Sequence, residues 1–203
     1  MVFVYSENRA SAWFSTAFDD NLRIFGTTFS VKNRAEALQL LLARLSLGAT
    51  VTGDLKNSHL DFAKKVVDTL ENLLEGKPAK PSFILALNEL PRFTQRVLNI
   101  VSRIPCGYVT TYSELAKAVG GGRAARAVAK SVATNPFLLL IPCHRVVPSD
   151  LMIGNYALGK TVKLDLIKRE ANKNAKPKSI KCDASTLKLL PAWKLLESNI
   201  PLI

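Results

Sequence analysis

Ile141-Pro142-Cys143-His144-Arg145-Val146-Val147 places a thiol beside an imidazole within an apolar segment. Free cysteine is among the most buried residue types, so an isolated Cys-His pair is usually part of a core. Here a proline stiffens the backbone before the pair, and the positive charge of the following arginine favours thiolate over thiol. The stretch as a whole therefore predicts a reactive cysteine, with His144 as the candidate base for Cys143.

The adjacency of the two residues limits how they can work together. Neighbouring side chains of an extended segment point to opposite faces. Cys143 and His144 must therefore meet across a turn or exchange a proton through a bridging water. Papain-like sites join a cysteine and a histidine from distant parts of the chain, so the local pair argues against that class of protease.

The charge of the chain indicates a polyanionic partner. The 203 residues carry a formal net charge of +12, which suits nucleic acid. A generic basic surface is the alternative, and the distribution of charge decides between the two. Residues 91–148 hold eight arginines and lysines but a single acid, Glu114. The basic charge is thus concentrated around the cysteine motif.

The cysteine and histidine counts exclude several kinds of site. Cys106, Cys143 and Cys182 are too few for a disulfide framework, although a Cys106–Cys182 bridge stays open. With only His59 and His144 available, we expect no protein-bound zinc site. No apolar run reaches the roughly 20 residues of a membrane span, and the first residues lack the pattern of a secretory signal. A cytoplasmic protein without membrane contact is therefore expected.

The first 87 residues predict a small α/β domain without chemistry of its own. Two β-prone runs, 12–18 and 22–29, flank Asp19-Asp20-Asn21 and indicate a hairpin. Apolar residues at helical spacing predict helices over 35–47 and 60–74, with His59 exposed at the start of the second. A linker over 77–81 and a short strand over 83–87 complete this region.

Residues 88–170 predict a mainly helical domain. A helix over 91–104 ends at Pro105-Cys106-Gly107, and Thr111 with Glu114 fits a capping box. Helices over 113–119 and 123–134, joined by three glycines, suggest a helix-turn-helix. The second of them has basic residues on one face and small alanines that allow close approach to a groove. A loop over 154–159 and a helix over 161–170 follow. From residue 171 we expect a basic linker and then an apolar segment, 187–193, that packs as a helix.

These motifs together resemble a known family. Ile141–Val146, Thr111-Tyr112-Ser113, Ala124–Val128, Asn135-Pro136 and Gly154-Asn155-Tyr156 occur in the order and at the spacing of the O6-alkylguanine-DNA alkyltransferases. The resemblance covers roughly residues 90–170. It implies an α+β fold, with a ribonuclease-H-like N-terminal α/β domain (1–87), a helical DNA-binding and alkyl-transfer domain with a helix-turn-helix (88–170), and an extension (171–203).

The resemblance also implies a role for each matching residue. Glu170 would fix the tautomer of His144, Tyr112 would protonate the departing guanine and help turn the nucleotide out, and Asn135 would tie the helix-turn-helix to the cysteine loop. The base pocket would be lined by Val146, Asn155, Tyr156 and Ala157. Arg126 would fill the gap left by the extruded base. The other DNA contacts would come from Thr94, Ser113, Arg123, Ala125, Ala127 and Lys130.

The implied activity is single-turnover repair. The protein would bind duplex DNA through the minor groove as a monomer, associated with the nucleoid or nucleus. It would extrude an O6-alkylguanine at a cost of a few kcal/mol. It would then keep the alkyl group on Cys143 as a stable thioether, without a cofactor. Two departures concern the pocket, where similar proteins often have Ser at Ala157 and Gly at Leu158. The alternatives are a lesion-binding module that does not repair, a helix-turn-helix regulator and a thiol hydrolase.

Overall fold

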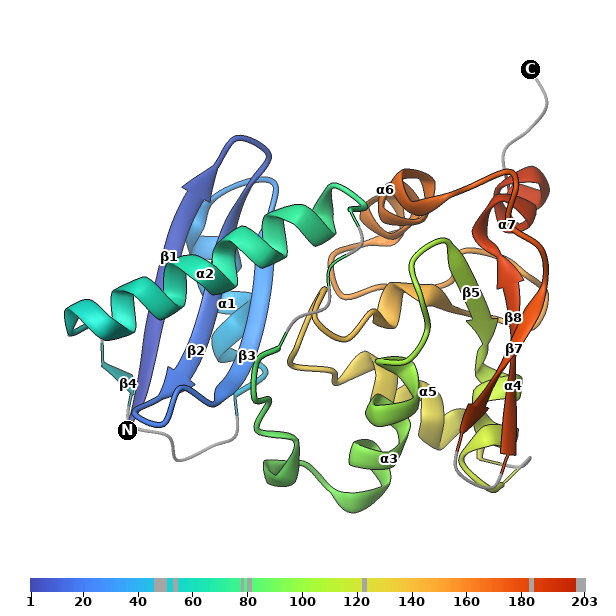
Figure 1. Ribbon diagram of the computed structural model, residues 1–203, viewed down its shortest axis with the longest axis horizontal. Helices are drawn as coiled ribbons and strands as arrows, with labels where there is room; N and C mark the ends of the chain where they lie inside the picture. The colour runs from blue at the N-terminus through green and yellow to red at the C-terminus, as the bar shows by residue number, and fades with distance from the viewer. Residues whose placement is uncertain are drawn as a thin grey trace. The chain divides into compact units, whose positions relative to one another are not determined.

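The computed structural model describes residues 1–45, 51–52, 55–77, 79, 82–121, 124–182 and 185–199. The chain divides into two compact units (Figure 1). The first consists of Met1–Pro91 and Asn135–Leu140, and the second of Arg92–Thr134 and Ile141–Ile203. No helix in these described ranges is long and apolar enough to cross a membrane.

The first unit is built on a four-stranded sheet with the order β3-β2-β1-β4. Its strands are β1 (Val2–Arg9), β2 (Ala12–Asp19), β3 (Ile24–Ser30) and β4 (Val51–Thr52). Antiparallel β2 and β3 confirm the predicted hairpin. Asp19 makes the turn, because its Oδ1 accepts hydrogen bonds from the amides of Asn21 and Arg23 at 3.0 and 2.9 Å. β1 was not predicted.

Helices cover both faces of this sheet (Figure 1). Ala17 of β2 belongs to a buried cluster with Leu41 of α1 (Arg34–Leu42). The ring of its neighbour Phe18 lies 5.1 Å from that of Phe62 in α2 (Asn57–Leu74). Since consecutive strand residues face opposite sides, α1 and α2 lie on opposite faces. Both predicted helices are confirmed, although the first ends at Leu42 and residues 43–45 are not helical. Residues 46–47 lie outside the described residues.

Two expectations for the first unit are wrong. His59 is buried, with its ring 4.2 Å from that of Phe3, because α2 begins at Asn57 and so turns His59 toward the sheet. The strand expected over 83–87 is reduced to one bridge between Leu85 and Ile24. A 3-10 turn, η1 (Leu87–Glu89), follows it.

The second unit combines helices with a second sheet, of order β6-β5-β8-β7. Its helices are α3 (Arg92–Val101), α4 (Tyr112–Ala118), α5 (Ala125–Ala133), α6 (Lys160–Glu170) and α7 (Ala192–Asn199). Its strands are β5 (Tyr108–Thr111), β6 (Val146–Val147), β7 (Lys178–Cys182) and β8 (Ser185–Pro191). The predicted α+β class, with a mainly helical C-terminal part, is confirmed.

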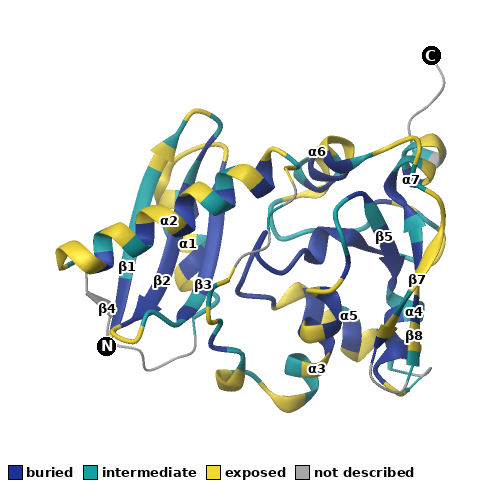
Figure 2. Cartoon of the chain, viewed as in Figure 1, coloured by how far each residue is buried: buried dark blue, intermediate teal, exposed yellow. Residues whose placement is uncertain are grey.

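Helices α4 and α5 form the predicted helix pair. The amide of Glu114 donates to Thr111 Oγ1 at 3.2 Å, so Thr111 caps α4 as expected. The Glu114 carboxylate pairs with Lys117 at 2.6 Å. Buried and exposed positions alternate along α5 at helical spacing (Figure 2). Val128 is buried and Arg126 is exposed.

The expectation for the C-terminal extension is wrong. Residues 178–182 and 185–191, expected to be linker and helix, form the antiparallel strands β7 and β8. β8 also pairs with β5, through Tyr108 opposite Pro191 and Val109 opposite Leu190. Apolar residues at alternate positions, with Leu187 and Leu189 buried between exposed neighbours, carry the strand signal. The extension completes the sheet of the second unit.

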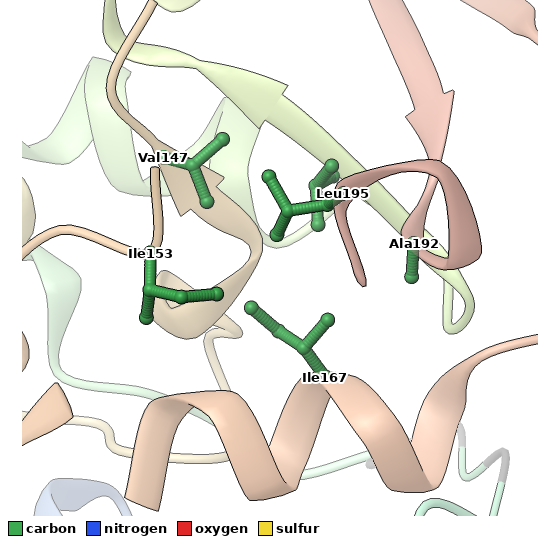
Figure 3. Packing of buried hydrophobic residues seen from close by; sticks show 6 residues of the cluster. Val147, Ile153, Ile167, Ala192 and Leu195 are labelled. Atoms are coloured by element: carbon green, nitrogen blue, oxygen red, sulfur yellow. The ribbon is translucent and has the colours of Figure 1, made fainter. Parts of the chain in front are cut away.

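Helix α7 belongs to the core of this unit (Figure 3). Ala192 and Leu195 of α7 form one buried cluster with Val147 of β6 and Ile167 of α6. Ile153, between β6 and α6 in the chain, also belongs to this cluster. Ile167 lies one helical turn before Glu170, so the extension supports the part of α6 that carries this carboxylate.

Replacing Leu195 with alanine should lower the free energy of unfolding by about 2–5 kcal/mol, because the buried side chain leaves a cavity. Urea unfolding followed by circular dichroism measures this. Leu42→Ala removes the same atoms from a side chain that is 47% exposed, and should cost under about 1 kcal/mol. Equal losses for the two variants would contradict the packing of α7.

Candidate active site

A tight turn holds the Cys-His pair. Pro142, at φ −78° and ψ 65°, occupies the centre of an inverse γ-turn, which the amide of Cys143 closes on the Ile141 carbonyl at 2.8 Å. The 3-10 turn η2 (Cys143–Arg145) follows, closed by the amide of Arg145 on the Pro142 carbonyl at 3.0 Å. Cys143 and His144 are only 5% and 1% exposed. The pair thus lies in a turn and not in an extended segment, which is one of the two ways in which these residues were expected to cooperate.

His144 is oriented by Glu170 of α6. Its Nε2 lies 2.9 Å from Glu170 Oε1, inside the core. An ionised carboxylate only accepts hydrogen bonds, so Nε2 carries the proton and Nδ1 keeps its lone pair. Nδ1 is buried and has no hydrogen-bond partner within the described part of the chain. The imidazole thus presents a basic nitrogen that its own protein leaves available.

Arg145 clamps the same carboxylate. Its Nε and Nη2 donate to the two oxygens of Glu170 at 2.8 and 2.7 Å, and its Nη1 donates to the Ile104 carbonyl at 2.5 Å. The expectation that Arg145 itself favours the thiolate needs correction, because Glu170 neutralises the guanidinium. Arg145 instead fixes the carboxylate in place through a bidentate contact.

The electrostatics of the group follow from this geometry. Burial raises the pKa of Glu170, but the charges and hydrogen bonds of His144 and Arg145 outweigh burial and bring that pKa down to about 2. Burial, together with the charges of Arg145 and Lys163, lowers the pKa of His144 and outweighs the opposing effect of Glu170. At neutral pH the site therefore holds an ionised carboxylate and a neutral imidazole, which is the protonation state a base requires.

Lys163 is a fully buried cation in the same region. Its ammonium donates to the carbonyl of Val146 at 2.8 Å and to that of Asn155 at 3.5 Å. No carboxylate of the described residues pairs with it. Burial lowers its pKa to about 8, and the charge of Cys143 acts in the opposite direction. The ammonium and a Cys143 thiolate would therefore stabilise each other.

Two tyrosines lie near the cysteine motif. Burial, followed by the charge of Cys143, raises the pKa of Tyr112, so its hydroxyl stays protonated at neutral pH and can donate. The ring of Tyr156 stands edge-on to His144, with 6.4 Å between ring centroids. Of the other residues predicted to line a base pocket, Val146 is buried, Ala157 is half-buried, and Asn155 has an exposed side chain. Their contact with a base stays a prediction.

Asn135 belongs to the first unit, where its buried Oδ1 accepts from the amide of Phe137 at 3.0 Å. Its predicted tether to the cysteine loop stays a prediction. Arg126, Ala127 and Lys130 are exposed on α5, and Ala125 is half-buried. Arg123 lies outside the described residues.

Two residues predicted to contact DNA already have partners within the protein. The hydroxyls of Thr94 and Ser131 lie 3.1 Å apart, joining α3 to α5. Ser113 Oγ lies 2.8 Å from Ser149 Oγ. Their predicted roles toward DNA stay predictions.

Cys106, Cys143 and Cys182 are thiols, so Cys106 and Cys182 do not form the bridge left open above. Among the residues that the structure describes, no three His, Cys, Asp or Glu side chains gather as metal ligands. The side chains that do gather, a thiol beside a base and a buried cation, suit attack of a thiolate on an electrophilic carbon.

Lys163 was not identified from the sequence as a candidate site residue, although its position in the sequence indicates one. It lies seven residues before Glu170, two helical turns along α6, and therefore on the same face. A lysine on the buried side of a helix is rare unless its ammonium group is paired with another group.

Comparison with known proteins relates the chain to repair proteins. Residues 92–172 match the family model described as 6-O-methylguanine DNA methyltransferase, DNA binding domain. The chain is 38% identical over 112 residues to a methylated-DNA–protein-cysteine methyltransferase of Methanosarcina acetivorans, covering 55% of this chain and 71% of the relative.

Two further relatives are covered less fully. Identity to the methylated-DNA–protein-cysteine methyltransferase of Methanothermobacter thermautotrophicus is 38% over 108 residues, which is 53% of this chain and 60% of that protein. Identity to the bifunctional transcriptional activator/DNA repair enzyme Ada of Escherichia coli is 43% over 79 residues, which is 39% of this chain and 22% of Ada. The chain thus spans less than two thirds of both proteins.

Among solved structures, the O6-methylguanine-DNA methyltransferase of the archaeon Pyrococcus kodakaraensis is similar, with a TM-score of 0.60 and 26% identity. The match covers 85% of this chain and all of that one.

Proposed function

Because the chain belongs to the O6-methylguanine-DNA methyltransferase family, we propose that it repairs O6-alkylguanine in duplex DNA by moving the alkyl group to Cys143. The observation that carries the proposal is the buried assembly of Cys143, His144, Glu170 and Arg145. A neutral imidazole fixed by an ionised carboxylate is placed directly after the thiol in a tight turn. This arrangement supplies what the reaction needs first, which is a base for a weakly acidic thiol.

The reaction follows from these groups. His144 Nδ1 takes the proton of the Cys143 thiol through a bridging water, and Glu170 stabilises the resulting imidazolium. The sulfur attacks the alkyl carbon in line with O6, so the S–C bond forms as the C–O6 bond breaks. The electron pair goes to the guanine, which receives a proton from the Tyr112 hydroxyl. The thioether is stable, so each molecule acts once.

Lys163 would assist the attack by stabilising the thiolate. Lys163→Met keeps much of the apolar stem and removes the buried charge, so we expect roughly a tenfold slower transfer at neutral pH, recovering as the pH rises. The pH–rate profile with free O6-methylguanine measures this. Lys168→Met, at an exposed position of the same helix, should leave the profile unchanged. An unshifted profile for Lys163→Met would refute the role of the buried cation.

Arg126 would occupy the space that the extruded base leaves. Arg126→Ala should slow transfer from duplex DNA by roughly 10–100-fold, since stacking is worth about 1–3 kcal/mol, while transfer from the free base stays normal. Lys130→Ala, on the same exposed face, is the matched control and should show only the loss of one phosphate contact. Equal losses on duplex and free base would count against intercalation.

Intact-protein mass spectrometry after mixing with a duplex carrying O6-methylguanine tests the proposal. We expect a gain of one methylene, located on Cys143 by peptide analysis, with one equivalent of DNA consumed per protein. Binding without a mass gain would favour the lesion-binding alternative. Catalytic turnover would favour a hydrolase, and binding set by sequence alone would favour a regulator.

A further inference from the structure

The loop between β6 and α6, residues 148–159, is joined by hydrogen bonds to helix α7 of the C-terminal extension. Nδ2 of Asn199, the last residue of α7, donates to the carbonyl of Leu151 in this loop at 2.7 Å. The same nitrogen donates to the carbonyl of Leu195, one turn earlier in α7, also at 2.7 Å. The nitrogen of a side-chain amide has two N–H donors. Asn199 therefore serves both carbonyls at once, and we call this pair of hydrogen bonds the Asn199 tether.

The conformation of the loop depends on such contacts. Leu151 lies at φ 61°, in the left-handed region. That region is unfavourable for leucine, and a residue stays in it when its surroundings hold it there. The side chain of Leu151 packs against the buried cluster that contains Leu195. Ile153, two residues further on, points into the same cluster (Figure 3). Helix α7 thus holds the loop through apolar packing as well as through the Asn199 tether.

The tethered part of the loop leads directly to the candidate active site. Asn155 follows Leu151 by four residues, and its carbonyl lies 3.5 Å from the Lys163 ammonium. The ring of Tyr156, the next residue, stands edge-on to His144. The tether therefore fixes the chain just before two of the residues predicted to line the base pocket.

The tether also joins two parts of the chain that relate differently to known proteins. The match to the family model spans residues 92–172, so it includes the loop and ends before α7 (Ala192–Asn199). A helix outside this match thus holds a loop inside it.

We propose that Asn199 is a positioning residue for the base pocket, and that α7 keeps the 148–159 loop in the conformation that accepts an O6-alkylguanine base. The inference rests on the proposed function, because it concerns the same pocket. A binding-competent conformation that is only partly populated weakens the apparent affinity by the populated fraction. The tether acts on the loop and not on the His144–Glu170 pair, so it should set how well the base binds and leave the transfer step unchanged.

Single-turnover transfer from free O6-methylguanine at increasing concentrations tests this. The half-saturating concentration reports binding of the base, and the limiting rate constant reports transfer. An ordinary hydrogen bond changes an equilibrium by roughly two- to tenfold. Asn199→Ala should therefore raise the half-saturating concentration by about three- to tenfold. The limiting rate constant and its pH profile should keep their wild-type values.

Other substitutions separate the donors of Asn199 from its shape. Asn199→Asp has nearly the same shape but no N–H donor, so it should raise the half-saturating concentration at least as much as Asn199→Ala. Asn199→Gln keeps both donors and should restore part of the affinity. Asn174→Ala removes an exposed asparagine from the same extension and should behave as the wild type. A folded Asn199→Asp variant with wild-type affinity would overturn the role of the tether.

Hydrogen exchange gives a second readout that does not depend on activity. The amides of residues 148–159 should exchange faster in Asn199→Ala than in the wild type, because the loop opens locally. The amides of α5 (Ala125–Ala133) should keep their wild-type rates. Equal acceleration in the loop and in α5 would indicate a general loss of stability and would count against a local tether.

The outcomes separate this inference from the proposed function. If the wild type transfers the methyl group and Asn199→Ala keeps the wild-type half-saturating concentration, only the inference about Asn199 fails. Equal losses of affinity and of the limiting rate constant would mean that Asn199 supports the fold as a whole, and would overturn it too. A wild type that transfers from neither the free base nor the duplex would overturn both proposals.

Discussion

Replacing Cys143 with alanine is expected to abolish alkyl transfer, so that no mass gain follows incubation with a duplex carrying O6-methylguanine. The sulfur is the only atom in the proposed reaction that forms a bond to the alkyl carbon, and alanine has no substitute for it. Binding to the same duplex should persist, because the exposed basic face of α5 is untouched. Electrophoretic mobility shift and intact mass measure the two properties on one preparation.

The other thiols provide the control for Cys143→Ala. Cys106→Ala removes a half-buried sulfur from the same unit. It should retain full transfer with a loss of stability of about 1 kcal/mol. Methylation that survives in Cys143→Ala, or disappears in Cys106→Ala, would mean that the nucleophile has been misassigned.

Glu170→Gln is expected to impair both stability and transfer. The amide can still accept from His144, but the buried guanidinium of Arg145 loses its counter-charge. Breaking a buried pair in this way costs about 3–5 kcal/mol. Transfer from the free base should fall by roughly 10²–10⁴-fold, because the imidazolium is no longer stabilised. Urea unfolding and single-turnover kinetics at low temperature measure the two losses separately.

A double variant separates folding from chemistry. Adding Arg145→Met to Glu170→Gln removes the unpaired charge, so part of the lost stability should return while transfer stays slow. Recovery of transfer together with stability would show that Glu170 acts only on the fold.

Glu170 also gives stability a pH dependence. Its pKa falls from 4.5 to about 2 on folding, so the folded state favours the ionised form. The contribution, on the order of 3 kcal/mol, is present above about pH 4.5 and is lost as the pH falls toward about 2. The Glu170→Gln/Arg145→Met variant should lack this acid-sensitive part of its unfolding free energy.

The centre of the site was predictable because it lies in a local signature. Cys143 and His144 are adjacent, and Glu170 ends a helix whose pattern is plain in the sequence. The structure brings Glu170 to His144 as expected. The partner of Arg145 was not predictable, because only the folded α6 shows that its guanidinium meets Glu170 and not the thiol.

The errors in the fold have a shared physical cause. Short runs with mixed patterns were assigned from local residues, whereas tertiary contacts decide their structure. Leu187 and Leu189 alternate as in a strand, but the basic residues before them suggested a linker, and only pairing with β5 settles β8. His59 was predicted to be exposed because the apolar pattern of this helix begins only at Leu60. In the structure α2 already begins at Asn57, so His59 lies within the helix.

The burial of Cys143 has a consequence for how many molecules remain ready to act. Under the proposed function, a protein that accepts one alkyl group is lost whenever another electrophile reaches it first. With 5% of its residue surface exposed, the sulfur is screened from freely diffusing alkylating agents, while a base delivered into the fold can still reach it. The core thus gives this thiol chemoselectivity, and its reactivity toward small electrophiles other than an O6-alkylguanine base should appear only when the second unit unfolds.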